Sequence, residues 1–151
     1  QITKNLNLDQ VDIIGWSDGG NTALIFNYEH PEMVNRIVAI GANMNPAGAK
    51  ENLIASLKKQ VAGNDPKTNQ RLIQLMLNHP DITANQLSLI TNPVLVVAGS
   101  EDVIKDEHTR LIHKLIRNSE LAIIPNATHY VPFEQPEKLN EIMLNFLKNK
   151  S

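Results

Sequence analysis

The chain has 151 residues, a formal net charge of −2 and no cysteine. This length suits one domain with a real hydrophobic core, and the missing cysteines exclude disulfide bonds and cysteine metal sites. The near-neutral charge gives no electrostatic basis for binding nucleic acid or an anionic membrane, and no apolar run approaches the roughly twenty residues that span a bilayer.

Apolar runs and helical patterns alternate along the chain. The apolar runs predict strands at residues 11–15, 36–41, 93–99 and 120–124. The helical patterns predict helices at residues 19–29, 51–62, 67–78, 83–90, 106–117 and 136–149. This alternation is typical of an α/β fold with a mostly parallel sheet, here of about four strands. The near-continuous apolar strands indicate that helices cover both faces of the sheet.

The first predicted strand and the first long helix are joined by the sequence GWSDGG at residues 15–20. A serine flanked by small residues between a strand and a helix is typical of a nucleophile elbow, which holds the hydroxyl clear of its own backbone. Side chains two residues either side of Ser17 would collide with the neighbouring strand or helix, so we expect Gly15 and Gly19 to be required, followed directly by Gly20. A glycine-rich turn with an incidental serine is the alternative interpretation.

The third and fourth predicted strands are followed by residues that could complete a catalytic triad. Glu101 and Asp102 come after the third strand, and His129 comes after the fourth. The carboxyl ends of parallel strands share one edge of a sheet, where ligands bind. A serine nucleophile needs a base, and the base needs an orienting acid. We therefore predict Ser17 as the nucleophile, His129 as the base and one of the two acids as its partner. Taken singly, the acid could be a turn former and the histidine could bond nearby backbone.

The neighbours of the predicted nucleophile and base have expected roles of their own. The N–H of Asp18 would point to the place where an oxyanion forms, and the helix that starts there adds partial positive charge. Trp16 and Tyr130 flank Ser17 and His129 in the sequence and are candidates for lining the substrate pocket. Packing is the plainer role for Trp16.

Two histidines of the helix predicted at residues 106–117 are poor candidates for metal ligands. His108 and His113 are five residues apart, which places them on different faces, so the paired spacing of a zinc helix is absent. We predict no metal site.

Several ordered stretches resemble the α/β-hydrolase superfamily. They are residues 14–20, 30–38, 93–102, 126–129 and 135–139. The resemblance implies a partial α/β-hydrolase fold, hydrolysis of a carboxylic ester or similar small acyl substrate through an acyl-enzyme, and no cofactor. It also places the acid at Asp102 in preference to Glu101. A fragment that serves as a binding or assembly module, and a cofactor-free perhydrolase or haloperoxidase-like enzyme, are the alternative functions.

The chain differs from that superfamily in the part that precedes the elbow. In that superfamily, several strands, a helix and a loop that donates the second oxyanion N–H come first, whereas here only residues 1–10 precede the elbow strand. We therefore expect a single domain, residues 1–151, with the N-terminal half of the fold absent. The elbow strand at residues 11–15 would then expose a bare edge, which predicts self-association or dependence on a separate N-terminal piece.

The chain begins with Gln1 and not with methionine. The absence of cysteine fits a reducing compartment, so we expect a cytoplasmic protein, although a signal peptide before Gln1 stays open.

The stretch at residues 43–91 is longer than one crossover helix requires. In the superfamily that the chain resembles, a small helical lid over the active site is often inserted here. We interpret residues 43–80 as such a lid or its remnant, which would shape the acyl pocket and exclude water. A pair of ordinary packing helices is the alternative.

Overall fold

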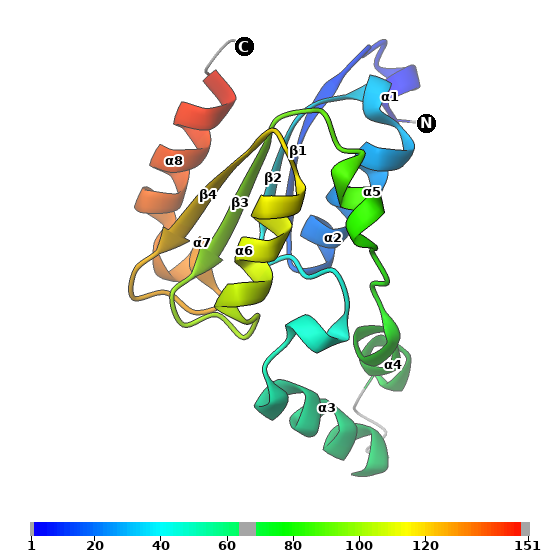
Figure 1. Ribbon diagram of the computed structural model, residues 1–151, viewed down its shortest axis with the longest axis vertical. Coiled ribbons are helices and arrows are strands. Elements are labelled where there is room, and N and C mark those ends of the chain that lie inside the picture. The colour runs from blue at the N-terminus through cyan, green and yellow to red at the C-terminus, as the bar shows by residue number, and fades with distance from the viewer. Residues whose placement is uncertain (1, 64–68, 149–151) are drawn as a thin grey trace.

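The computed structural model describes residues 2–63 and 69–148. Within them, four parallel strands form one sheet in the order β1-β2-β3-β4, with helices on both of its faces (Figure 1). The strands are β1 (Val11–Trp16), β2 (Val34–Ile40), β3 (Val94–Gly99) and β4 (Ser119–Ile124). The predicted α/β fold with a mostly parallel sheet of about four strands is confirmed.

Every predicted helix is present, with shifted ends. The helices are α1 (Ile2–Asn5), α2 (Asp18–Glu29), α3 (Glu51–Gly63), α4 (Gln70–Asn78), α5 (Ala84–Ser88), α6 (Asp106–Leu115), α7 (Val131–Glu134) and α8 (Pro136–Lys148). Short 3-10 turns lie at Pro31–Met33 and Pro46–Gly48. Positions 67, 68 and 149 of the predicted helices, and part of the predicted lid segment, lie outside the described residues. The single turn of α7 was not predicted.

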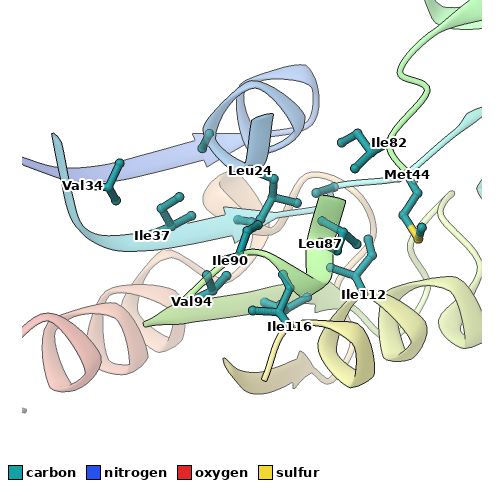
Figure 2. Close-up of a cluster of buried hydrophobic side chains, with 14 residues drawn as sticks. Leu24, Val34, Ile37, Met44, Ile82, Leu87, Ile90, Val94, Ile112 and Ile116 are labelled. Atoms are coloured by element: carbon teal, nitrogen blue, oxygen red, sulfur yellow. The ribbon is translucent and has the colours of Figure 1, made fainter. Parts of the chain in front are cut away.

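Two apolar clusters lie on opposite faces of the sheet. Along β3, Val94 and Val96 belong to the cluster under α2, α5 and α6, while Leu95 and Val97 belong to the cluster under α8. Figure 2 shows the first cluster, where Leu24 of α2 lies among side chains of the sheet, α5 and α6. Because successive strand residues point to opposite faces, a sheet covered on both sides needs the continuous apolar runs seen in the sequence.

The carboxyl ends of the four strands meet at one edge of the sheet, as parallel pairing requires. Ser17 follows β1, Gly41 follows β2, Asp102 lies just beyond β3, and His129 lies beyond β4. In Figure 1, α3 and α4 extend from this end of the molecule, away from the layer of helices that covers the sheet. The shared strand ends gather loops that are distant in sequence in one place.

Among the described residues, no helix is long and apolar enough to cross a membrane.

Strand β1 lies at one edge of the sheet. Within the described residues, β1 has a strand partner on one side only, and Ile14 in it is 53% exposed. We propose that this edge pairs with a second copy of the chain, because unpaired strand edges are templates for association. Sedimentation velocity is expected to show concentration-dependent self-association that Ile14→Lys weakens. A chain that stays monomeric at every concentration would contradict the proposal.

Candidate active site

Ser17 lies in a strained turn between β1 and α2. Its backbone has φ 56° and ψ −121°, a region that residues with a side chain rarely adopt. The turn is held by backbone hydrogen bonds on both sides. The Ser17 N–H donates to Ile40 O at 2.8 Å, and the Ser17 carbonyl accepts from Gly20 N–H at 2.9 Å and Asn21 N–H at 3.1 Å. The surrounding structure thus over-determines the strained conformation and fixes the position of the hydroxyl.

The glycines of the turn differ in how much they are needed. A Cβ on Gly15 would lie 2.1 Å from the carbonyl oxygen of Gly19, and a Cβ on Gly20 would lie 3.2 Å from the Cβ of Ala42. In contrast, a Cβ on Gly19 would meet nothing within 4 Å. The steric requirement predicted for Gly19 is therefore wrong. Gly19 lies on the exposed side of the first turn of α2, and only its backbone approaches the strand.

The structure brings Ser17, His129 and Asp102 together. His129 Nε2 lies 3.0 Å from Ser17 Oγ, and His129 Nδ1 lies 2.8 Å from Asp102 Oδ1. The same carboxylate oxygen accepts the N–H of Ile104 at 2.9 Å. The Asp102 side chain is 2% exposed and that of His129 is 14% exposed, so solvent screens these contacts only weakly.

This arrangement selects one tautomer of the imidazole. A carboxylate accepts hydrogen bonds, so the proton between Asp102 and His129 belongs to Nδ1. Nε2 then has a free lone pair for the hydroxyl proton of Ser17. Glu101, the other candidate acid, is exposed, and its backbone N–H donates to Ala127 O at 2.9 Å. It is Asp102 that contacts the imidazole.

Gly41 is a site residue that the sequence analysis missed. It has φ +59°, and a Cβ there would lie 2.8 Å from His129 Cε1 and 3.4 Å from Asp102 Oδ2. The absence of a side chain lets the imidazole lie directly against the end of β2. A lone glycine just beyond an apolar strand was the available signal, but the predicted strand ran through it.

Replacing Gly41 with alanine is therefore expected to displace the imidazole. We expect kcat/KM for a substrate that depends on this imidazole to fall about a hundredfold, since a misplacement of about 1 Å costs that much. The left-handed backbone should also cost about 1–2 kcal/mol of unfolding free energy. The matched control is Gly63→Ala, where a Cβ would meet nothing within 4 Å. Steady-state kinetics and thermal unfolding of both variants check this, and equal kinetics would contradict it.

Trp16 and Tyr130 both lie beside the imidazole. The indole Nε1–H of Trp16 donates to the carbonyl oxygen of His129 at 2.8 Å. The ring centroids of Trp16 and Tyr130 are 5.6 Å apart, and those of Trp16 and His129 are 5.9 Å apart. Trp16 thus packs against the rings of His129 and Tyr130, as the plainer interpretation expected. Its indole N–H also bonds the main chain of His129, which was not predicted.

Asp18 begins α2, directly after Ser17. Its carboxylate Oδ1 accepts from Asn21 Nδ2 at 3.3 Å. Asn21 in turn exchanges two hydrogen bonds with Asn43, of 2.8 Å to the Asn43 N–H and 3.1 Å to its side chain. This polar network ties the loop after β2 to the turn that carries Ser17. The role of the Asp18 N–H as an oxyanion donor stays a prediction.

A cavity of about 440 Å³ opens beside Ser17, and we call it the elbow cavity. It is lined by Trp16, Ser17, Asp18, Asn43, Pro46, Ala49, Leu53, Ile54, Leu57, Met76, His79, Val103, Ile104, His129 and Tyr130. Of the three predicted triad residues, Ser17 and His129 contribute to this lining. The apolar side chains that α3 and α4 contribute are Leu53, Ile54, Leu57 and Met76. We propose that α3 and α4 act as the lid expected for residues 43–80.

His108 and His113 have separate structural partners. His108 Nε2 accepts the N–H of Met44 at 2.9 Å, and burial, together with the nearby charge of Lys105, lowers the pKa of His108. His113 Nδ1 lies 2.8 Å from the hydroxyl of Ser119. A neutral His108 thus holds the loop after β2, which carries part of the cavity wall.

The chain is similar to known proteins in both sequence and structure. Residues 3–151 match the sequence pattern of the prolyl oligopeptidase family. The carboxylesterase CesB of Bacillus subtilis has a similar structure, with a TM-score of 0.74 at 21% sequence identity, over 99% of this chain and 64% of that one. At this identity the structural likeness concerns the fold alone.

Two curated relatives also match nearly the whole chain. The serine hydrolase BPHL of Homo sapiens is 25% identical over 97% of this chain and 58% of its own length. The 2-hydroxy-6-oxononadienedioate/2-hydroxy-6-oxononatrienedioate hydrolase 1 of Dechloromonas aromatica is 28% identical over 94% of this chain and 63% of its own length. The chain thus spans about three fifths of the length of these relatives.

Proposed function

Because the chain belongs to the prolyl oligopeptidase family and to the α/β-hydrolase superfamily, we propose that it is a serine hydrolase that cleaves a carboxylic ester or a similar acyl bond. The observation that carries the proposal is the unbroken hydrogen-bonded series from Asp102 through His129 to Ser17, with contacts of 2.8 and 3.0 Å. A serine, a base and an orienting acid at these distances are what nucleophilic acyl transfer requires.

The reaction has two halves. In the first, Ser17 Oγ attacks the carbonyl carbon while its proton passes to His129 Nε2, and the imidazolium then protonates the departing alcohol. In the second, water loses a proton to Nε2, its oxygen attacks the acyl carbon, and Ser17 recovers its proton as the acid leaves. Asp102 stabilises the imidazolium in both halves. The Asp18 N–H and the start of α2 stabilise the oxyanion.

The elbow cavity supports an uncharged, apolar acyl group as the substrate moiety. Its lid side carries aliphatic side chains, and its described lining contains no lysine or arginine. An anionic acyl group would lose its hydration there, beside the carboxylate of Asp18, without gaining a cationic partner. The Dechloromonas relative is named for dioate substrates, which carry two carboxylates, so we propose a different substrate class for this chain.

Acyl-chain length should therefore control the rate. Between p-nitrophenyl acetate and hexanoate, kcat/KM is expected to rise up to about fourfold for each methylene that becomes buried, since burying one contributes about 0.8 kcal/mol. The p-nitrophenyl ester of a dicarboxylic acid of matched length should react at least tenfold more slowly than hexanoate. Steady-state kinetics over the series check this. Equal or faster cleavage of the anionic ester would contradict the proposed class.

A fluorophosphonate probe tests the proposed function directly. The probe is expected to label the chain, and peptide mapping should place the adduct on Ser17, since the activated hydroxyl attacks phosphorus as it attacks a carbonyl. Heat-unfolded protein is the control, because labelling should require the folded triad. Absence of labelling, or an adduct on another residue, would leave a non-catalytic binding module as the better account.

An amide or peptide bond is the second candidate, because the matching family is named for peptide cleavage. The same hydroxyl, base and acid can open either bond. A matched ester and anilide of hexanoic acid distinguish the two. Faster cleavage of the anilide than of the ester would favour the peptidase.

A further inference from the structure

The loop that carries His129 is irregular and needs its own restraints. It joins β4 to α7, and Asn126 in it has φ +54°. Residues in such a loop lack the regular ladder bonds that hold a strand, so other contacts must satisfy and fix the backbone. The loop after β3 supplies two of them: Ser100 Oγ accepts the Asn126 N–H at 3.0 Å, and the Glu101 N–H donates to Ala127 O at 2.9 Å. The contact of 3.0 Å between His129 Nε2 and Ser17 Oγ depends on these restraints, because they fix the main chain that carries the imidazole.

Glu134 supplies a two-point restraint from α7. Its Oε2 accepts the Thr128 N–H at 2.6 Å, and its Oε1 accepts the Thr128 hydroxyl at 2.9 Å. The Thr128 hydroxyl also accepts the N–H of Tyr130 at 3.3 Å. One carboxylate thus ties down the residues on both sides of His129. Hydrogen bonds to a carboxylate are roughly twice as strong as neutral ones.

The short helix explains how Glu134 reaches this place. The Tyr130 carbonyl accepts the Glu134 N–H at 3.0 Å, which closes one turn immediately after His129. That turn brings position 134 back beside position 128. On the other side, the carbonyl of His129 accepts the Trp16 indole N–H at 2.8 Å. The main chain around the imidazole is therefore held from α7 and from β1.

We propose that Glu134 is a positioning residue for His129, acting through Thr128 and not on the substrate. The catalytic part of this inference rests on the proposed hydrolase function, whereas the structural part does not. Without the carboxylate, the loop can shift while the apolar side chains that α3 and α4 contribute to the elbow cavity stay in place. Loss of Glu134 should therefore lower kcat and leave KM nearly unchanged.

The test uses Glu134→Gln, which keeps the size of the side chain but replaces one acceptor oxygen with a donor. We expect kcat to fall tenfold to a hundredfold, with KM within twofold of wild type. The matched control is Glu141→Gln, which removes an exposed carboxylate that bonds Lys138 at 2.9 Å within α8. The control should keep wild-type kinetics. Thr128→Val, which keeps the amide but loses the hydroxyl, should give a smaller fall than Glu134→Gln.

A spectroscopic measurement separates positioning from general destabilisation. In wild type, the proton shared by His129 Nδ1 and Asp102 should give a downfield resonance in proton NMR, and Glu134→Gln should weaken or broaden it at temperatures where the protein remains folded. This resonance does not depend on turnover, so it tests the restraint even if fluorophosphonate labelling fails. A kcat within twofold of wild type, or an unchanged resonance with activity lost only in proportion to unfolded protein, would overturn the proposal.

Discussion

Replacing Ser17 with alanine is expected to lower kcat for an ester by about 10⁶-fold, because the residues of a triad act as a unit and the nucleophile has no substitute. The hydroxyl occupies a strained turn and lies 3.0 Å from His129 Nε2. No covalent intermediate can form without it. Binding of the substrate should survive, since the elbow cavity keeps its apolar lining, so a competitive ester analogue should bind the variant as it binds wild type.

The control for this prediction is Ser88→Ala. Ser88 lies at the end of α5, where its hydroxyl bonds Asn85 O at 2.7 Å, and its loss should leave kcat unchanged. Single-turnover kinetics with purified protein measure both variants. Ser17→Ala activity within tenfold of wild type would contradict the assignment of the nucleophile.

Replacing Asp102 with asparagine should lower kcat by about 10⁴-fold while the fold is kept. The carboxylate accepts hydrogen bonds from His129 Nδ1 and from the N–H of Ile104, at 2.8 and 2.9 Å. An asparagine can present its NH₂ group to the imidazole, which favours the tautomer with the proton on Nε2. That tautomer cannot accept the proton of Ser17.

Glu101→Gln is the matched control, because Glu101 is the neighbouring acid and its exposed side chain lies outside the series that links Asp102, His129 and Ser17. Its kcat should stay within twofold of wild type. If Glu101→Gln lost more activity than Asp102→Asn, the acid would be misassigned. Circular dichroism of both variants checks that the fold is intact.

Those features of the fold that repeat along the sequence could be predicted from it. The run at residues 93–99 is apolar at every position from Val94 to Gly99, so its burial on both faces predicted β3 to within one residue. The chain order of serine, acid and histidine, each after a strand, predicted which side chains would share an edge. Parallel pairing then brings them together, because equivalent ends of parallel strands lie side by side.

Features that depend on one close contact could not be predicted in the same way. Gly41 matters because any Cβ at this position would collide with His129, and this contact joins the end of β2 to the loop after β4. Glu134 matters because a single helical turn returns it to Thr128. Gly19 shows the converse error: its place in the motif predicted a steric need for glycine, but a Cβ there would meet nothing within 4 Å. Each depends on three-dimensional placement and leaves no periodic pattern in the sequence.

The measurement closest to the central claim is rapid-quench mass spectrometry of the chain with p-nitrophenyl hexanoate. Acid quenching within the first turnover should yield protein heavier by one hexanoyl group, and peptide mapping should find that group on Ser17. The acylated fraction should appear as fast as p-nitrophenol is released and should be absent from Ser17→Ala. Release of p-nitrophenol at the full rate with no acylated protein, or with the acyl group on another residue, would contradict acyl transfer through Ser17, His129 and Asp102.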